Sequence, residues 1–170
     1  MPFELQPILS GELVELRPLV PADWDEMFAV ASDPLIWEQH PASDRYQEPV
    51  FREFFTGALD CGGGFAILDK RTDQIIGSTR YFGYDEFKSE IEIGWTFLAR
   101  KYWGGTCNRE LKRLMLDHAF QFVERVLFFV GEHNLRSQKA MEKIGGVRVP
   151  SMSKRHAGGL NVCYVIKKPS

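Results

Sequence analysis

The chain has 170 residues, a hydrophobic content of 44% and thirteen phenylalanines, enough apolar material for one core, so we expect a single domain over residues 1–170. The net charge is −2, no apolar run approaches the roughly 20 residues of a membrane helix, and the N-terminus lacks a signal pattern, which favours a cytoplasmic protein. The three cysteines, at positions 61, 107 and 163, form no Cys-x-x-Cys pair, so the sequence predicts free thiols and no metal site.

Charge is unevenly distributed along the chain. Residues 1–60 carry twelve Asp or Glu and three Lys or Arg, whereas residues 61–170 carry eleven and eighteen. Surface solvation explains any single one of these charges, but together they suit an enzyme that takes a cationic acceptor on one side and a polyanionic ligand on the other. The acidic first third and the lack of a basic stripe with interleaved aromatics argue against a nucleic-acid binder.

The first half of the chain reads as a strand, two helices and a hairpin. Alternation predicts a strand over residues 12–19, and one-sided apolar spacing predicts helices over residues 23–31 and 51–59. Two further strands, residues 65–69 and 74–81, are joined by a polar turn.

The second half alternates strands with helices. Residues 89–98 alternate like a strand, and apolar residues recur with helical spacing over residues 111–123, which places Lys112 on the solvent side. The run 126–130 has the length of a buried strand, Asn134 is expected to cap a helix that ends at Gly145, and residues 162–168 form a last strand. This order predicts an α/β (α+β) fold, in which a mixed sheet has helices on both faces.

A loop with little side-chain bulk precedes the central helix. Gly104, Gly105, Thr106 and Asn108 allow backbone N–H groups to approach a ligand at the positive end of the helix dipole, which favours phosphate or pyrophosphate. The loop lacks the Gly-Lys-Ser/Thr of a Walker loop and the three glycines of a dinucleotide fingerprint, and a plain turn is the alternative. The same helix start is expected to favour a thiolate at Cys107.

Two segments resemble a known family. The loop, with Trp103 before Gly104 and with the following run LMLDHAF at 114–120, resembles motif A of the GNAT acetyltransferases, and more narrowly the RimJ/RimL-like branch (ribosomal-protein alanine acetyltransferase-like). Residues 134–145 are similar to the family's Asn-x-x-Ser and closing Glu-Lys-Leu-Gly patterns, and the resemblance covers nearly the whole chain. Lys101 stands where the family usually has Gln or Arg, and Thr106 where it has Gly or Ala.

The resemblance implies a GNAT-like central sheet, mixed and largely antiparallel, of six to seven strands. It also implies that the strand ending near Leu98 and the strand from Val126 splay apart around the pantetheine arm of acetyl-CoA, with a bulge expected at Gly94. The residues assigned to acetyl-CoA in this way are Thr96, Phe97, Leu98, Lys101, Trp103, Gly104, Gly105, Thr106, Cys107, Asn108, Asn134, Ser137 and Lys139.

Acetyl transfer to an amine needs a base for the amine and a group that stabilises the leaving thiolate. Glu90 and Glu92 lie on one face of a strand beside the expected acetyl site, and some family members use a glutamate there; the alternatives are that they face water or pair across the sheet. His156 is a third candidate base. The family's usual tyrosine position holds Met141, so Ser137 is the candidate for the leaving sulfur, with helix capping as its alternative role.

The sequence thus predicts an acetyl-CoA-dependent N-acetyltransferase, with an amine-bearing acceptor attacking the thioester directly and with no nucleic-acid or membrane partner. A catalytically inactive CoA-binding regulatory or interaction module is the alternative, favoured by Lys101, Thr106 and Met141. The sequence does not select among a protein N-terminus, an aminoglycoside, a polyamine and an amino acid as acceptor. It does not fix the oligomeric state either, for which a homodimer is one option.

Overall fold

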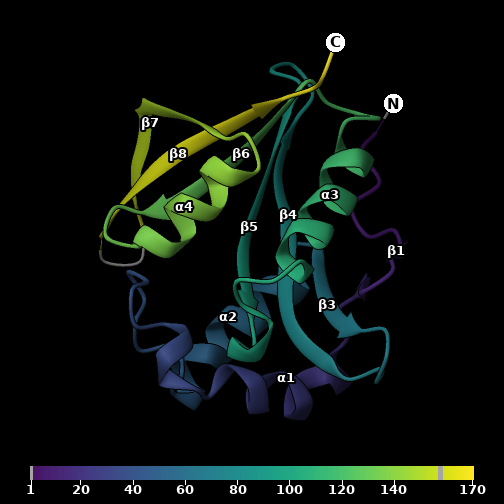
Figure 1. Cartoon of the computed structure of the whole chain (residues 1–170), viewed down its shortest axis with the longest axis vertical. Helices are drawn as coiled ribbons and strands as arrows, with labels where there is room; N and C mark the ends of the chain where they lie inside the picture. Colours follow the sequence, from purple (N-terminus) through teal and green to yellow (C-terminus); the bar gives the residue numbers. More distant parts are fainter. Residues whose placement is uncertain (1, 157–158) are drawn as a thin grey trace.

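A computed structural model describes residues 2–156 and 159–170, with His156 described by its backbone alone. Its centre is one eight-stranded sheet in the order β1-β2-β3-β4-β5-β6-β8-β7 (Figure 1). The strands are β1 (Leu9–Ser10), β2 (Val14–Pro18), β3 (Gly64–Asp69), β4 (Ile75–Asp85), β5 (Glu90–Leu98), β6 (Arg125–Gly131), β7 (Val147–His156) and β8 (Gly159–Lys167). The helices are α1 (Trp24–Ala31), α2 (Glu48–Asp60), α3 (Cys107–Ala119) and α4 (Leu135–Lys143), with 3-10 turns η1 (Pro21–Asp23), η2 (Pro34–Ile36) and η3 (Arg100–Tyr102).

The helices cover both faces of the sheet, as predicted. On one face, Leu111 and Met115 of α3 pack on Tyr81 and Ile93 in a core that Met141 of α4 also joins. On the other face, α1 and α2 cover the sheet in a second core rich in phenylalanine. Figure 1 shows α3 and α4 lying along the sheet and α1 and α2 gathered near its lower end. Each amphipathic helix thus buries its apolar stripe on the sheet, which is the main source of stability for such layers.

All strand pairs are antiparallel except β5 with β6, which are parallel. That pair holds only from Glu90↔Arg125 to Glu92↔Leu127, and the two strands separate beyond it. The splayed strands expected from the sequence are therefore confirmed. Parallel neighbours need a crossover, and α3 provides it, so the start of α3 lies at the open end of the pair.

A bulge in β5 sits at this open end. Arg80 pairs with Gly94 and Ser78 with Phe97, so two residues of β5 oppose one of β4. The left-handed residue is Trp95, with φ 51°, rather than Gly94, where the bulge was expected. Such a backbone costs about 1–3 kcal/mol for a residue with a side chain. The ring contacts of Trp95 with Phe82 and with the Arg80 guanidinium help to offset that cost.

The sheet has eight strands instead of six to seven because two edge strands escaped the sequence pattern. β1 has two residues, and β7 pairs with β8 alone among the described strands. β7 contains Pro150 and mostly polar residues, which is common at an edge, where one side of the backbone needs no partner. The central helix also begins earlier than predicted, at Cys107 instead of Leu111.

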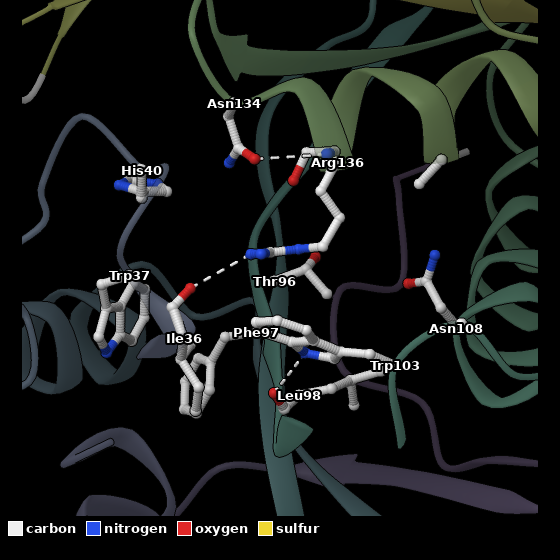
Figure 2. Close-up of a pocket in the computed structure, with 13 residues that line it drawn as sticks. Ile36, Trp37, His40, Thr96, Phe97, Leu98, Trp103, Asn108, Asn134 and Arg136 are labelled. Atoms are coloured by element: carbon white, nitrogen blue, oxygen red, sulfur yellow. Dashed lines mark hydrogen bonds between the residues drawn. The ribbon is translucent and has the colours of Figure 1, made fainter. Parts of the chain in front are cut away.

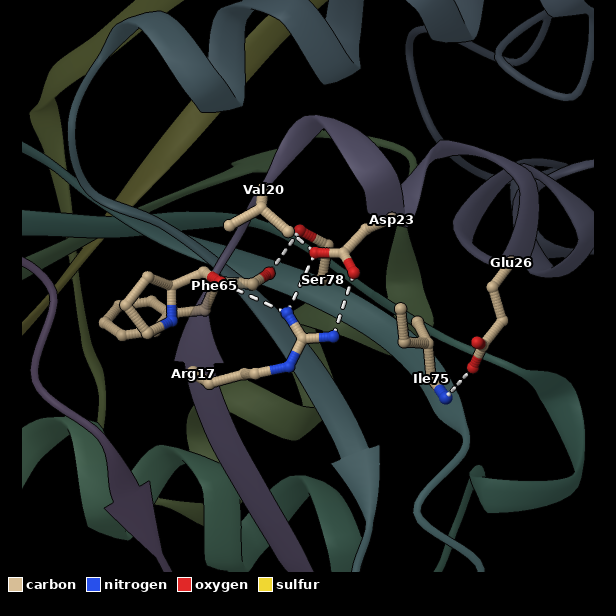
Figure 3. A network of polar contacts seen from close by, with 8 residues as sticks. Arg17, Val20, Asp23, Glu26, Phe65, Ile75 and Ser78 are labelled. Atoms are coloured by element: carbon tan, nitrogen blue, oxygen red, sulfur yellow. Dashed lines mark hydrogen bonds and ion pairs between the residues drawn. The ribbon is translucent and has the colours of Figure 1, made fainter.

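Polar contacts fix α1 against two strands (Figure 3). Arg17 of β2 donates to both carboxylate oxygens of Asp23, at 2.9 and 2.8 Å, and Asp23 also accepts the Val20 N–H at 3.0 Å. Glu26 of α1 accepts the backbone N–H of Ile75 at the start of β4. These bonds hold η1 and α1 against β2 and the start of β4.

Candidate functional site

The separation of β5 from β6 opens a cleft, which we call the β5–β6 cleft. It consists of two adjoining pockets of about 160 and 140 Å³. Its walls come from β5, the start of α3, the end of β6, α4 and the loop before α2. Figure 2 shows the residues that line the first pocket. The residues common to both pockets are Trp37, His40, Thr96, Asn108, Asn134, Ser137 and Ala140.

The β5 wall contains the three residues expected to supply a backbone edge. Thr96, Phe97 and Leu98 all line the first pocket. The carbonyl oxygen of Leu98 already accepts a hydrogen bond from Nε1 of Trp103 at 2.9 Å (Figure 2). The Thr96 hydroxyl lies 2.8 Å from that of Thr79 on β4. Beyond Glu92 the β6 side of β5 has no partner among the described strands, and Leu98 anchors the following loop.

The loop before α3 forms the mouth of the cleft. Gly104 has φ 69°, a conformation that favours glycine, and it lines the first pocket together with Asn108. Among the residues that the structure describes, none accepts a hydrogen bond from the N–H of Gly104, Gly105 or Thr106. These donors precede the first turn of α3, an arrangement that suits an anion; the phosphate site expected from the sequence stays a prediction.

Cys107 corrects the sequence interpretation of this loop. It is the first residue of α3, yet its pKa is raised by burial and by the nearby carboxylates of Asp69 and Glu110. The expected thiolate is therefore disfavoured. Glu110 itself accepts backbone N–H groups of residues 12–14 at 2.8 Å each. Burial alone would raise the pKa of Glu110, but these three bonds outweigh it and lower that pKa.

The start of α4 forms the opposite wall. Oδ1 of Asn134 accepts the backbone N–H of Ser137 at 3.3 Å, so Asn134 is the helix cap that the sequence predicted. Because Asn134 fills that role, Ser137 is not needed as the cap, and it lines both pockets. Met141, at the family's usual tyrosine position, lines the second pocket. Lys101 and Lys139 are exposed and line neither pocket.

Arg136 crosses the cleft from α4. Its Cζ lies 3.7 Å from the ring centroid of Trp103, and Nη2 donates to the carbonyl oxygen of Ile36 at 3.3 Å. Figure 2 shows this side chain between Ile36 and Trp103. Its pKa is lowered by burial, which reflects a position inside the cleft rather than on a solvated face.

The two candidate carboxylates differ in their surroundings. Glu90 pairs with Arg125 at 2.6 Å where β5 and β6 are still joined, and it lines neither pocket. Glu92, opposite Leu127, is the last residue of β5 that pairs with β6 and also lines neither pocket, but it lies closer to the bulge, since a Cβ placed on Gly94 would meet its Oε2 at 3.1 Å. Burial raises the pKa of Glu92, while Lys154, 3.6 Å away, and Arg80 oppose that rise. The third candidate base, His156, falls outside the side chains that the structure describes.

Lys112 is a cleft residue that the sequence interpretation missed. We expected it on the solvent face of α3, but it is 3% exposed, and its Nζ donates to the Thr96 hydroxyl at 2.8 Å. Burial lowers its pKa to about 7. Helical spacing alone could not indicate this, because α3 is flanked by the sheet on one side and by the cleft on another. Its buried surface is therefore wider than one apolar stripe.

The chain is similar in sequence and in structure to known proteins. The sequence profile of a family described as "Acetyltransferase (GNAT) domain" matches residues 14–147. A protein described as an acetyltransferase from T. thermophilus has a similar structure, with TM-score 0.78 and 29% identity over 97% of this chain and 91% of that chain. Among curated proteins, no sequence matches.

Two more distant structures share the fold. A GCN5-related N-acetyltransferase from Brucella melitensis superposes with TM-score 0.82 at 20% identity, covering 98% of this chain and 80% of that one. A protein described as a ribosomal-protein-serine acetyltransferase from Vibrio cholerae gives TM-score 0.75 at 13% identity, with coverage of 96% and 99%. In the described residues, no helix is long and apolar enough to cross a membrane, and no cluster of three metal-ligating side chains occurs.

Proposed function

This chain belongs to the GNAT acetyltransferase family, and we propose that it transfers an acetyl group from acetyl-CoA to a primary amine by direct attack of the amine on the thioester. The observation that carries the proposal is the β5–β6 cleft, which runs from an unpaired strand edge to the open start of α3. One end of this cleft suits an anionic group and the other an extended chain that bonds to backbone.

The residues present fit acetyl-CoA. The free N–H groups of Gly104, Gly105 and Thr106 at a helix start suit a pyrophosphate. The edge of β5 at Thr96 and Phe97 suits the amide groups of the pantetheine arm. When bound there, acetyl-CoA supplies the activated acetyl group. Lys101 and Lys139, which the resemblance assigned to the cofactor, lie outside the cleft, and we leave them out of the proposed site.

Glu92 is the proposed base. Its raised pKa makes it a better proton acceptor than an exposed glutamate, and it lies beside the bulge at which the amine and the acyl carbon would meet. As the N–C bond forms and the C–S bond breaks, the amine proton passes to the Glu92 carboxylate. Ser137 lines the cleft, and its hydroxyl would donate a hydrogen bond to the sulfur as it leaves as a thiolate. Glu90 is excluded from this scheme because Arg125 holds it at the closed end of the strand pair.

The branch within the family rests on the sequence motif. Trp103-Gly104 with Asn108 supports the RimJ/RimL-like assignment, and the likeness to the Vibrio cholerae protein, at 13% identity, concerns the fold alone. We propose the cytoplasm as the location.

The test is thiol release from acetyl-CoA in the presence of a panel of primary amines. Release that depends on an amine supports the transferase and removes the inactive-module alternative. Binding of acetyl-CoA by calorimetry without release with any amine would support that alternative. No binding at millimolar acetyl-CoA would overturn both.

A further inference from the structure

A second groove adjoins the β5–β6 cleft on the α2 side of the sheet. It has a volume of about 690 Å³. Its lining residues come from the loop before α2, from α2 and from β4, together with Trp95 of the bulge. Arg45 and Trp95 line both this groove and the second pocket of the cleft. The groove and the cleft are therefore neighbours on either side of these two side chains. We call this space the arginine groove.

Two buried guanidinium groups face the arginine groove. Arg45 is 8% exposed and Arg80 is 5% exposed. They share one aromatic support, since their Cζ atoms lie 5.0 and 5.1 Å from the ring centroid of Phe54. Arg80 also donates to the Phe54 carbonyl oxygen at 3.1 Å, and Nη1 of Arg45 lies 3.4 Å from Nε2 of His40.

Neither arginine forms an ion pair with a carboxylate in the part of the chain that the structure describes. Asp44 and Glu53 also line the groove, but both are exposed. A buried charge without a counter-ion is costly, and guanidinium groups match a carboxylate with two parallel hydrogen bonds. The two cations therefore make the groove a receptive site for one anionic group.

The pKa values of the two arginines also indicate a site for an anion. Burial, with Arg80 as the next cause, lowers the pKa of Arg45 to about 10. Burial also lowers the pKa of Arg80, while Cys61 and Glu92 partly oppose that effect. An anion bound between the two groups would relieve both penalties. The neighbouring groups compensate the two charges only in part: Asp44 acts on Arg45, and Cys61 and Glu92 act on Arg80. The contact of Arg80 with Trp95, at 4.4 Å, also supports the bulge.

We propose that the arginine groove binds a carboxylate of the acceptor, so that the acceptor is a small amino-acid-like molecule carrying both a primary amine and a carboxylate. This inference rests on the proposed acetyl transfer. The sequence led us to expect a cationic acceptor because the first third of the chain is acidic; the groove instead favours an acceptor with a negative group. The acidic groups of the groove are exposed, whereas its buried charges are positive. With the carboxylate on Arg45 and Arg80, the amine would extend past Trp95 toward Glu92.

The test compares acceptors that differ only in the carboxylate. Rates of acetyl transfer are measured with L-alanine, L-leucine and L-phenylalanine and with the corresponding amides, corrected for the fraction of neutral amine. We expect kcat/KM to be at least tenfold higher for the acids. Equal or faster reaction of the amides, of a polyamine or of a neutral peptide would overturn the carboxylate site while leaving acetyl transfer intact. No turnover with any amine would instead count against the proposed function.

Single substitutions test whether Arg45 and Arg80 bind the carboxylate of the acceptor. Arg80→Met and Arg45→Met should raise KM for the acids about tenfold or more and change it less than threefold for the amides. Arg52→Met removes an exposed arginine of the same helix layer and should change neither. Equal KM changes for acids and amides in Arg80→Met would contradict the proposal.

A binding measurement on the wild-type protein tests the same site without variants and without turnover. N-acetyl-L-alanine should raise the melting temperature of the wild-type protein more than N-acetyl-L-alaninamide does, by mass action on the folded state. No difference between these two probes would overturn the inference without any rate measurement.

Discussion

The guanidinium of Arg136 lies over the indole of Trp103, with Cζ 3.7 Å from the ring centroid. This contact joins α4 to the loop that starts α3, across the mouth of the β5–β6 cleft (Figure 2). Trp103 is tied to β5 as well, through its bond to the Leu98 carbonyl. One indole thus sets the relative position of the walls that the proposed cofactor would touch.

Replacing Trp103 should weaken the binding of acetyl-CoA. Trp103→Ala removes the contact with Arg136 and the bond to Leu98, so the α3 loop loses its fixed position. We expect the Kd for acetyl-CoA, measured by calorimetry, to rise about tenfold, which corresponds to about 1.4 kcal/mol. Trp24→Ala is the matched control, because Trp24 packs on Phe28 and lines neither pocket of the cleft. It should lower stability and leave Kd unchanged; a similar Kd for both variants and wild type would contradict a role for Trp103 in the site.

Ser137 should contribute to the rate rather than to cofactor binding. If its hydroxyl stabilises the leaving sulfur, Ser137→Ala should lower kcat about ten- to a hundredfold, a loss of about 1.4–2.7 kcal/mol in the transition state. The cap of α4 remains in this variant, because Asn134 accepts the backbone N–H of residue 137. Asn134→Ala should instead lower the melting temperature. A Ser137→Ala variant with unchanged kcat and reduced stability would assign Ser137 to structure alone.

Substitutions of Glu92 and of Glu90 should have different effects on the pH dependence of the rate. Burial raises the pKa of Glu92, so its carboxylate form, which the base needs, is lost as pH falls through that raised value. Glu92→Gln should lower kcat/KM and, after correction for the fraction of neutral amine, remove the acidic limb of the pH–rate profile. Glu90→Gln loses an ion pair with Arg125, so it should cost stability and keep the profile. If both variants retain the wild-type profile, neither glutamate is the base.

Much of the fold could be predicted because its signals are local. The strand with residues 89–98, the capped helix after Asn134 and the glycine-containing loop each follow from periodicity or capping within about ten residues. The edge strands β1 and β7 lacked such a signal, because an edge strand needs only one partner and tolerates proline and polar residues.

The candidate site depends more on residues that are distant in sequence. The separation of Glu90 from Glu92 follows from Arg125 and Lys154, which belong to strands far along the chain. Arg45 and Arg80 meet at Phe54 only after α2 folds onto the sheet, so no spacing rule could have joined them. The resemblance to a family led to the proposed cofactor loop but gave no information on these pairings.

The amine of Lys112 is buried and titratable. In the folded protein its pKa is about 7, whereas an unfolded lysine has the ordinary value of 10.5. Between these values the unfolded chain binds more protons than the folded one, so the contribution of Lys112 to stability falls as pH drops from 10.5 to 7 and is constant below 7. At neutral pH the buried amine is therefore a net cost, despite its bond to Thr96.

Lys112→Met keeps the length of the side chain and removes the titrating group. The variant should have a larger free energy of unfolding than wild type at pH 7, and this gain should shrink as pH rises toward 10.5, because the neutral amine costs less there. The measurement is urea unfolding at a series of pH values from neutral to alkaline. Lys88→Met, which changes an exposed lysine, should show no such trend. A Lys112→Met variant that is less stable than wild type at pH 7 would mean that the bond to Thr96 outweighs the desolvation of the amine.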